Sequence, residues 1–349
     1  MLFNIDVDQG SRIVGYVVPD NFSESSSVRI TDGARDVLVL PCQEERAALV
    51  YAGRHGNGRC GFTIDETIIA DLSRQEALEI YDHETNILIY RRRPPSQVTQ
   101  KRVFRLETHL IPLWRIDDKV ERHFQYFYKG IERHGLETAT QMFLLNNSSS
   151  LYLSGRLNFR SYELYINETF NCVAVLRDPY RELAERLLAL KLVRKSANGA
   201  QLLGMRDMLS FAPAIDFAEA IEIDEKALHR AFATMPPAAI ANLANPVTRQ
   251  LASRNPDEVP RKGAVAIALG TLSRFAIVGL RERQDLFRAQ LGELVGADAH
   301  GLPEMPSFNR TAELCEQLKF VPEAQVLIEQ DLEVYFHVKS AIEAALSDP

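Results

Sequence analysis

An arginine at the end of an apolar segment is the residue best placed for chemistry in this sequence. Residues 172–176 are continuously apolar, which is typical of a buried parallel strand, and Arg177 follows them directly. Asp178 and Pro179 then predict a helix N-cap and a first helical turn. Parallel sheets bind ligands at the carboxyl ends of their strands, where an arginine can hold a phosphate with two hydrogen bonds. The alternative, which residue type alone favours, is that Arg177 pairs with a nearby carboxylate.

Two further arginines and one histidine are candidates for the same site. Arg115 and Arg156 can join Arg177 around a different anion, such as a glycan carboxylate or a sugar phosphate, because arginine binds such groups without a lysine. An arginine stays protonated and cannot act as a general base. His109 can take that role if it faces the cleft, although a lone histidine is more often structural.

Several segments, in order along the chain, resemble the carbohydrate sulfotransferases. The stretch Arg177-Asp178-Pro179-Tyr180 after its strand is similar to the family motif that binds the 3′-phosphate of the sulfate donor. Three other segments are also similar to family segments, in the same order along the chain. They are a strand ending in Ser-Gly, a later strand with Val-Gly-Leu before x-Glu-Arg, and a closing Asp-x-x-x-Tyr. The likeness covers about residues 100–346, through the segments 151–159, 171–181, 275–283 and 331–335.

The resemblance implies both a fold and a reaction. The fold is α/β and P-loop-like. The reaction is transfer of a sulfuryl group from 3′-phosphoadenosine 5′-phosphosulfate (PAPS) to a sugar hydroxyl, in the metabolism of bacterial surface polysaccharides. In such a site Arg177 and Arg115 would bind the donor, Arg156 would bind the carbohydrate, and His109 would be the catalytic base.

Three departures from the family pattern predict a degenerate donor site. Residues 109–118 stand where the family has a Pro-Lys-Thr-Gly-type loop at a helix N-terminus, yet they contain no glycine, lysine or hydroxyl residue. Asp117 and Asp118 suit the positive end of the following helix and would repel a phosphate. Glu185 replaces a serine eight residues after the motif arginine, and Arg156 replaces a histidine.

Three functions therefore stay open. The chain is a sulfotransferase-like protein with a degenerate donor site, a non-catalytic glycan-binding or regulatory protein on the same scaffold, or a transferase whose rebuilt anion pocket serves another reaction. Whether it is an enzyme is left undecided by the residues.

The first 90 residues predict an antiparallel β-sandwich. Short β-branched or aromatic segments alternate there with turn clusters such as Asp32-Gly33. The basic and proline-containing run at 91–96 predicts a linker, so we expect a sandwich over 1–95 and an α/β domain over 99–349. The sandwich loosely resembles accessory domains of glycan-modifying transferases, with Tyr16, His55 and Phe62 available for sugar stacking or for the core. The expected strands are Arg12–Val18, Val28–Ile30, Val37–Leu40, Ala47–Ala52, Gly61–Ile64, Leu78–Asp82 and Asn86–Tyr90.

The second domain alternates strands with helices, which predicts a parallel sheet and a helical C-terminal part. Apolar spacing predicts a helix over Asp118–Arg133, and leucines at 183, 187 and 190 give the helix after Pro179 one apolar face. The last helix is expected to bury one side. The other expected elements are strands at Val103–Leu110, Cys172–Leu176 and Phe275–Val278 and a helix at Arg283–Leu294, and the buried side of the last helix is Leu332, Tyr335, Phe336, Ile342 and Leu346.

The composition is that of an ordinary globular protein, with 349 residues, 46% hydrophobic and 25% charged. A net charge of −7 argues against a general nucleic-acid binder. Residues 1–10 have no basic run and the apolar tract 263–280 is interrupted, so we expect no signal peptide, no membrane span and a cytoplasmic protein. Four cysteines without metal-type spacing predict free thiols and no metal site, with a Cys42–Cys60 disulfide as the alternative.

Overall fold

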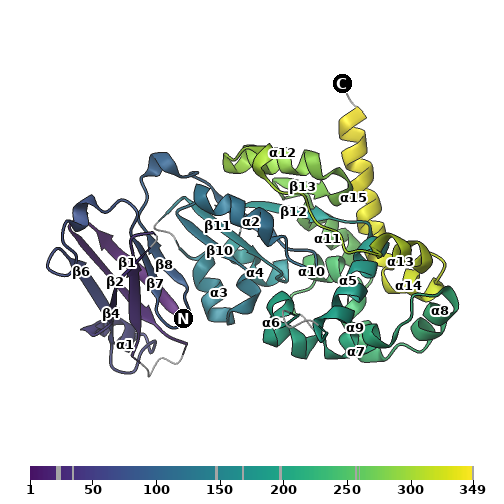
Figure 1. Cartoon of the computed structure of the whole chain (residues 1–349), viewed down its shortest axis with the longest axis horizontal. Helices are drawn as coiled ribbons and strands as arrows, with labels where there is room; N and C mark the ends of the chain where they lie inside the picture. Colours follow the sequence, from purple (N-terminus) through teal and green to yellow (C-terminus); the bar gives the residue numbers. More distant parts are fainter. Residues whose placement is uncertain are drawn as a thin grey trace. The chain divides into compact units, whose positions relative to one another are not determined.

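The computed structural model describes residues 1–20, 25–33, 35–145, 148–166, 169–195, 199–255, 258 and 260–347. Its internal contacts divide the chain into two compact units, which can be followed by colour in Figure 1. The first unit contains Met1–Val103 and Val120–Leu153, and the second contains Phe104–Lys119 and Ser154–Pro349. The first unit therefore includes residues 120–153, which the predicted division assigns to the second domain.

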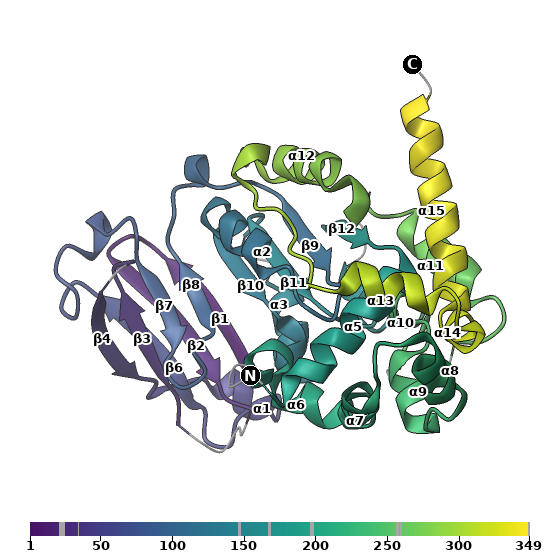
Figure 2. The same cartoon turned by 45° about the vertical axis from the view of Figure 1, so that its right-hand side comes forward.

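Two antiparallel sheets of four strands form the N-terminal part of the first unit, as predicted (Figure 2). Alternate residues of several strands are buried, as Ile13, Val17, Phe62 and Ile64 illustrate in the first sheet, whereas residues 88–91 of the second sheet are all buried. The first sheet has the order β1 (Leu2–Asp8), β2 (Arg12–Val18), β6 (Arg59–Asp65), β5 (Glu44–Glu45). The second has the order β4 (Asp36–Pro41), β3 (Ser27–Thr31), β7 (Glu79–Asp82), β8 (Leu88–Arg91).

Two sequence expectations fail in this unit, and for His55 and Phe62 the structure favours the core over sugar stacking. Residues 47–52 form a helix, α1 (Ala47–Tyr51), because the segment Ala-Ala-Leu-Val-Tyr lacks the alternation of a strand. The predicted helix over 118–133 is interrupted by strand β10 (Tyr126–Lys129), whose three consecutive aromatic residues favour a strand. Phe62 and His55 are buried, so they form no sugar-stacking surface with Tyr16. The unit also holds α3 (Leu136–Phe143) and the short 3-10 segments Leu72–Arg74, Pro95–Gln97, Glu121–His123 and Ile131–Arg133.

A five-stranded parallel sheet confirms the predicted α/β class. Its order is β10, β11 (Leu151–Gly155), β9 (Arg102–Leu106), β12 (Asn171–Leu176), β13 (Ile277–Leu280). The chain leaves β9 toward one edge of the sheet and leaves β12 toward the other edge. These two neighbouring strands thus flank a topological switch point, where α/β sheets form a crevice at the carboxyl ends of the strands. Residues 107–110 and Arg177 lie at those ends.

In the second unit the helix α5 (Pro179–Val193) packs against α7, α13 and α15, and its three predicted apolar residues, Leu183, Leu187 and Leu190, are buried. In β13, Gly279 is required by close packing, because a Cβ there would lie 2.5 Å from Phe287. The helices are α2 (Trp114–Val120), α4 (Phe159–Ile166), α5 (Pro179–Val193), α6 (Gly199–Ser210), α7 (Ala212–Ala220), α8 (Glu225–Ala233), α9 (Pro237–Leu243), α10 (Pro246–Ala252), α11 (Ala264–Leu272), α12 (Gln284–Val295), α13 (Thr311–Leu318), α14 (Pro322–Leu327) and α15 (Glu329–Ser347), with 3-10 segments at Arg281–Arg283 and Ala299–Gly301.

The expected apolar face of the last helix is wrong. In α15, Phe336 is 65% exposed and Leu346 is 51% exposed, while Asp331, Val334 and Val338 are buried. The helix contacts the rest of the unit along a narrow stripe near its start. The spacing of apolar residues along the whole helix therefore does not predict which of them are buried.

Candidate functional site

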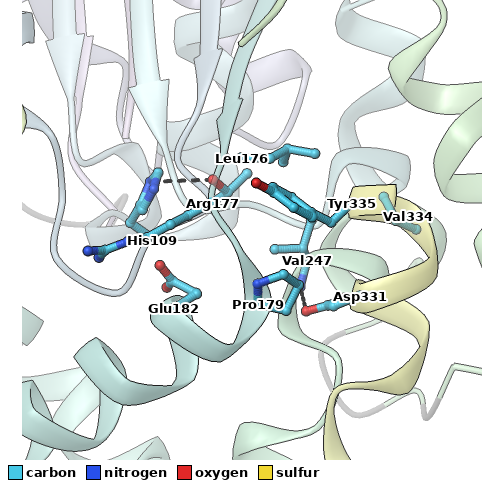
Figure 3. Close-up of a pocket in the computed structure, with 10 residues that line it drawn as sticks. His109, Leu176, Arg177, Pro179, Glu182, Val247, Asp331, Val334 and Tyr335 are labelled. Carbon is cyan, nitrogen blue, oxygen red and sulfur yellow. Dashed lines mark hydrogen bonds between the residues drawn. The ribbon is translucent and has the colours of Figure 1, made fainter. Parts of the chain in front are cut away.

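A small cavity lies where β9 and β12 end, at the switch point of the sheet (Figure 3). Its volume is about 10 Å³, close to the space that one water molecule requires. Figure 3 shows side chains from the two strand ends facing residues of α5 and α15. The lining residues are Thr108, His109, Leu176, Arg177, Pro179, Glu182, Val247, Asp331, Val334 and Tyr335.

The loop after β9 folds around the carboxylate of Glu107. Glu107 Oε1 accepts the backbone N–H of His109 at 3.2 Å, and Oε2 accepts that of Leu113 at 2.7 Å. Oε2 also accepts from Arg105 at 2.9 Å. Burial alone would raise the pKa of Glu107, but the charge of Arg105 and these hydrogen bonds lower it to about 2. A carboxylate of the chain itself therefore holds backbone N–H groups of the loop after β9.

Arg105 fixes this arrangement from within the sheet. The guanidinium is 1% exposed and makes a bidentate pair with Asp117 of α2, at 2.8 Å and 2.7 Å. Ser154 of β11 donates to the same carboxylate at 2.8 Å. Asp117 is thus a buried partner of Arg105. The sequence instead suggests a free negative charge at a helix N-terminus, and of the two acids only Asp118 is exposed.

His109 is 2% exposed and lines the cavity. Its Nδ1 lies 3.2 Å from Glu107 Oε1 and 3.4 Å from the hydroxyl of Thr108. Its Nε2 is shielded from solvent and has no hydrogen-bond partner among the residues that the structure describes. A buried polar atom without a partner costs free energy, so this nitrogen is a candidate contact for a ligand.

Arg177 lies at the end of β12, as predicted, and pairs with a carboxylate of the chain. It forms an ion pair with Glu185, one of the three departures noted in the sequence, and donates to the Ser307 hydroxyl at 2.7 Å. Glu185 also pairs with Arg281 at 3.5 Å. Burial, and next the charge of Arg281, lower the pKa of Arg177 to about 10. Of the two alternatives for this arginine, the structure favours pairing with a carboxylate.

Two further acids at the cavity are held by the chain. Glu182 of α5 accepts from Arg186 at 2.8 Å, and Arg186 also donates to the carbonyl of Thr108 at 2.8 Å. Burial works to raise the pKa of Glu182, but the charges of Arg186 and of the other basic groups nearby together outweigh it, and the pKa is lowered. Asp331 accepts the backbone N–H groups of Val247 and Thr248 at the start of α10. Burial raises the pKa of Asp331.

The start of α5 is capped as the sequence predicts. The side chain of Asp178 accepts the backbone N–H of Arg181 at 3.1 Å, with Pro179 in the first turn. The N–H of Asp178 donates to Glu282, and the same carboxylate accepts from the Tyr335 hydroxyl at 3.1 Å. Tyr335 thereby links α15 to the ends of β12 and β13.

The four predicted site residues fall into two groups. His109 and Arg177 line the cavity together, whereas Arg115 and Arg156 are not among its lining residues. Arg115 is exposed on α2. Arg156 donates to the carbonyl of Leu110 at 3.2 Å, pairs with Asp207 and lies over the ring of Phe211. The expected convergence of three arginines on one anion is therefore not seen at this cavity.

Sequence reasoning missed Glu107 and Glu182 as residues of the site. Glu107 follows β9 at the position where ligand-binding loops begin, and Glu182 lies one turn into the capped helix α5. A carboxylate directly after a buried strand is the signal that would have identified Glu107.

The four cysteines are buried and free, so Cys42 and Cys60 form no disulfide, and burial raises the pKa of Cys42 to about 12.

Comparisons with known proteins leave the family open. No protein-family model matches the chain, and no curated protein matches it. Within the described parts of the chain, no helix is long and apolar enough to span a membrane. The same residues contain no group of three or more His, Cys, Asp or Glu side chains that would hold a metal ion.

Proposed function

We propose that this protein is a non-catalytic relative of the carbohydrate sulfotransferases, and that it binds a glycan or regulates a partner in bacterial surface-polysaccharide metabolism. One observation carries the proposal: at the switch point, the chain's own carboxylates engage the groups that would bind a phosphorylated donor. Glu107 accepts the loop N–H groups, and Glu185 pairs with Arg177 and Arg281.

The residues present do not fit PAPS. A phosphate placed about 4 Å from the carboxylate of Glu185 would meet a repulsion of about 4 kcal/mol per pair of unit charges at an effective dielectric constant near 20. That repulsion weakens binding about a thousandfold. The cavity of about 10 Å³ also lies far below the roughly 300–1,000 Å³ that small-molecule and cofactor sites occupy. The residues of this chain therefore do not support sulfuryl transfer from PAPS.

The biological setting of the proposal comes from the sequence resemblance. Residues 171–181 and 275–283 supply the strand ends of the switch point, and both are similar to sulfotransferase segments. The parallel sheet and the crevice at its switch point support the proposal of a sulfotransferase-like scaffold. The substituted Glu185 and the missing glycine, lysine and hydroxyl residues of 109–118 support the loss of donor binding.

A thermal-unfolding titration with adenosine 3′,5′-bisphosphate tests the proposal. A ligand present at 100 times its Kd adds about 2.7 kcal/mol of stability. We expect millimolar nucleotide to leave the unfolding temperature unchanged, in the wild type and in Arg177→Ala. Saturable stabilisation of the wild type that is lost in Arg177→Ala would overturn the proposal, because it would place the nucleotide at the end of β12.

A further inference from the structure

Three consecutive arginines end strand β8 and begin the segment after it, and the first two pair with acids of the first unit. Arg91 is 4% exposed and pairs with Glu79 and, at 3.0 Å, with Glu121. Arg92 pairs with Asp8 at 2.6 Å. The chain's own carboxylates therefore neutralise both of these charges.

The third arginine, Arg93, is held by backbone carbonyls instead. Its Nη1 donates to the carbonyl of Arg122 at 2.8 Å and to that of Phe124 at 3.4 Å. A carbonyl oxygen satisfies an N–H group without neutralising its charge, so the guanidinium keeps its positive charge. These two bonds also fix Arg93 beside the 3-10 segment Glu121–His123.

Arg122 and His123 continue the positive charge from there. Nε of Arg122 donates to Nε2 of His123 at 3.1 Å, so the ring is neutral and carries its proton on Nδ1. Burial, and next the charges of Arg122 and Arg93, lower the pKa of His123, because the three groups lie close together. Arg122 is exposed, and Arg93 and His123 are partly exposed. Within the described ranges of the chain, no carboxylate forms an ion pair with any of these three residues, which we call the basic cluster.

The chemistry of the basic cluster favours carboxylates. Guanidinium groups bind a carboxylate with two parallel hydrogen bonds, and clusters of arginines are a common means of recognising acidic peptide motifs. An exposed ion pair improves affinity by no more than about fivefold, so a single small anion is bound weakly. A ligand of this cluster must therefore bring several acids at once.

The charge of the whole chain limits how long such a ligand can be. The net charge is −7, so a long polyanion that extends beyond the cluster meets a protein of its own sign. A short acidic segment confines its charge to the cluster. This difference favours a segment of a protein over a nucleic acid or an acidic polysaccharide.

We propose that the basic cluster docks a short acidic segment of a partner protein, whose carboxylates pair with Arg93 and Arg122 and accept from Nδ1 of His123. These residues belong to the first unit and are not among the residues that line the switch-point cavity. The proposal therefore goes beyond the proposed function and does not depend on the loss of donor binding.

Fluorescence anisotropy of a labelled hexa-aspartate peptide with the full chain tests the proposal. We expect saturable binding at an ionic strength of about 0.05 M that weakens at about 0.3 M, because salt screens exposed charges. Hexaserine should not bind, and inorganic phosphate should compete no better than chloride at equal ionic strength. Absence of peptide binding, equal binding of hexaserine, or tighter binding of an oligogalacturonate of the same charge would contradict the proposal.

Paired variants locate the binding on the surface. Arg93→Gln combined with Arg122→Gln should weaken the peptide about tenfold, since two exposed ion pairs are lost. Arg35→Gln combined with Arg59→Gln removes the same charge from exposed positions of the same unit and should change the affinity by less than about twofold. Arg122→Gln alone, which leaves the carbonyl contacts of Arg93 in place, should give an intermediate loss. Equal losses in the two double variants would overturn the proposal, because the peptide would then respond only to overall charge.

NMR of the histidine rings gives a readout at the cluster itself. Carboxylates bound beside His123 favour its charged form, so the hexa-aspartate peptide should move the midpoint of its titration to higher pH. His337 on α15 is the internal reference and should titrate as it does without peptide. Peptide binding that leaves His123 unchanged would place the docking site elsewhere and contradict the proposal.

Discussion

The two carboxylates at the switch point, Glu107 and Glu185, are held in different ways. Glu107 accepts from two backbone N–H groups, from Arg105 and from His109, so its partners belong to the local fold of the loop. Glu185 pairs with two arginines, Arg177 and Arg281, which come from the ends of two strands. The first carboxylate completes a backbone structure, and the second neutralises a pair of cations.

This difference predicts how each half of the site responds when its carboxylate is replaced. Replacing Glu107 would leave loop N–H groups without an acceptor and would remove one of the two acids that pair with the buried Arg105. Replacing Glu185 would leave two neighbouring arginines and the hydroxyl of Ser307, which are groups that bind anions. Without Glu185, the end of β12 would thus have the groups that bind an anion, whereas the β9 loop folds around its own acid.

The largest effect is expected from Glu107→Gln. Removing one partner of a buried ion pair typically costs about 3–5 kcal/mol, and this residue also anchors two backbone N–H groups. Urea denaturation should report a loss in that range. Glu293→Gln, which alters an exposed acid on α12, is the matched control and should unfold close to the wild type. A loss for Glu107→Gln no larger than the control's would show that the loop does not depend on this carboxylate.

Acid should act on the same residue. The pKa of Glu107 is lowered from its ordinary 4.5 to about 2, so its contribution to stability is present above about pH 4.5 and is lost as the pH falls toward 2. A depression of this size corresponds to about 3 kcal/mol. Denaturation measured between about pH 6 and about pH 2 should show a smaller loss of stability in acid for Glu107→Gln than for the wild type. Equal losses in both proteins would assign the acid sensitivity to other groups.

Glu185→Gln should cost less than Glu107→Gln, about 1–3 kcal/mol, because the amide oxygen still accepts one hydrogen bond from an arginine. Denaturation of both variants under the same conditions ranks them directly. If Glu185→Gln were the more damaging change, the distinction between a structural carboxylate and a neutralising one would be reversed.

The smallest effect is expected at the cap of α5. Asp178→Ala removes the acceptor for the N–H of Arg181 and should cost about 1 kcal/mol. Asp178→Asn retains a capping oxygen and should restore most of that loss. A cost for alanine as large as that of Glu107→Gln would mean that the cap also supports the site through its contact with Glu282.

The sequence predicts the elements of this site better than the contacts between them. The strand 172–176, the Asp178 cap and the apolar residues of α5 are local patterns, and the structure has all three. The choice of Glu185 as the partner of Arg177 depends on α5 lying against the strand ends. Both residues stand out in the sequence, but the contact between them cannot be predicted from it. The orientation of α5 about its own axis decides whether Glu185 faces Arg177.

The failures have a similar physical origin. Phe124 and Phe127 fit helical spacing, yet the neighbouring Tyr126 and Tyr128 are also buried, and only a strand places them between two covered faces. Glu107 gave no signal in a motif search, since its role is to accept N–H groups of its own loop. Arg115 and Arg156 were grouped with Arg177 by residue type, although their positions depend on tertiary packing.

The most direct test of the account is anion binding by Glu185→Ser. Thermal unfolding is followed with inorganic phosphate at constant ionic strength, with Glu313→Ser as a control that removes an exposed acid and Glu185→Gln as a second variant at the site. We predict saturable stabilisation of Glu185→Ser, loss of that effect when Arg177→Ala is added, and no such stabilisation of the wild type or Glu313→Ser. Equal stabilisation of the wild type and Glu185→Ser, or none in either variant at position 185, would contradict the claim that this carboxylate stands in place of an anion.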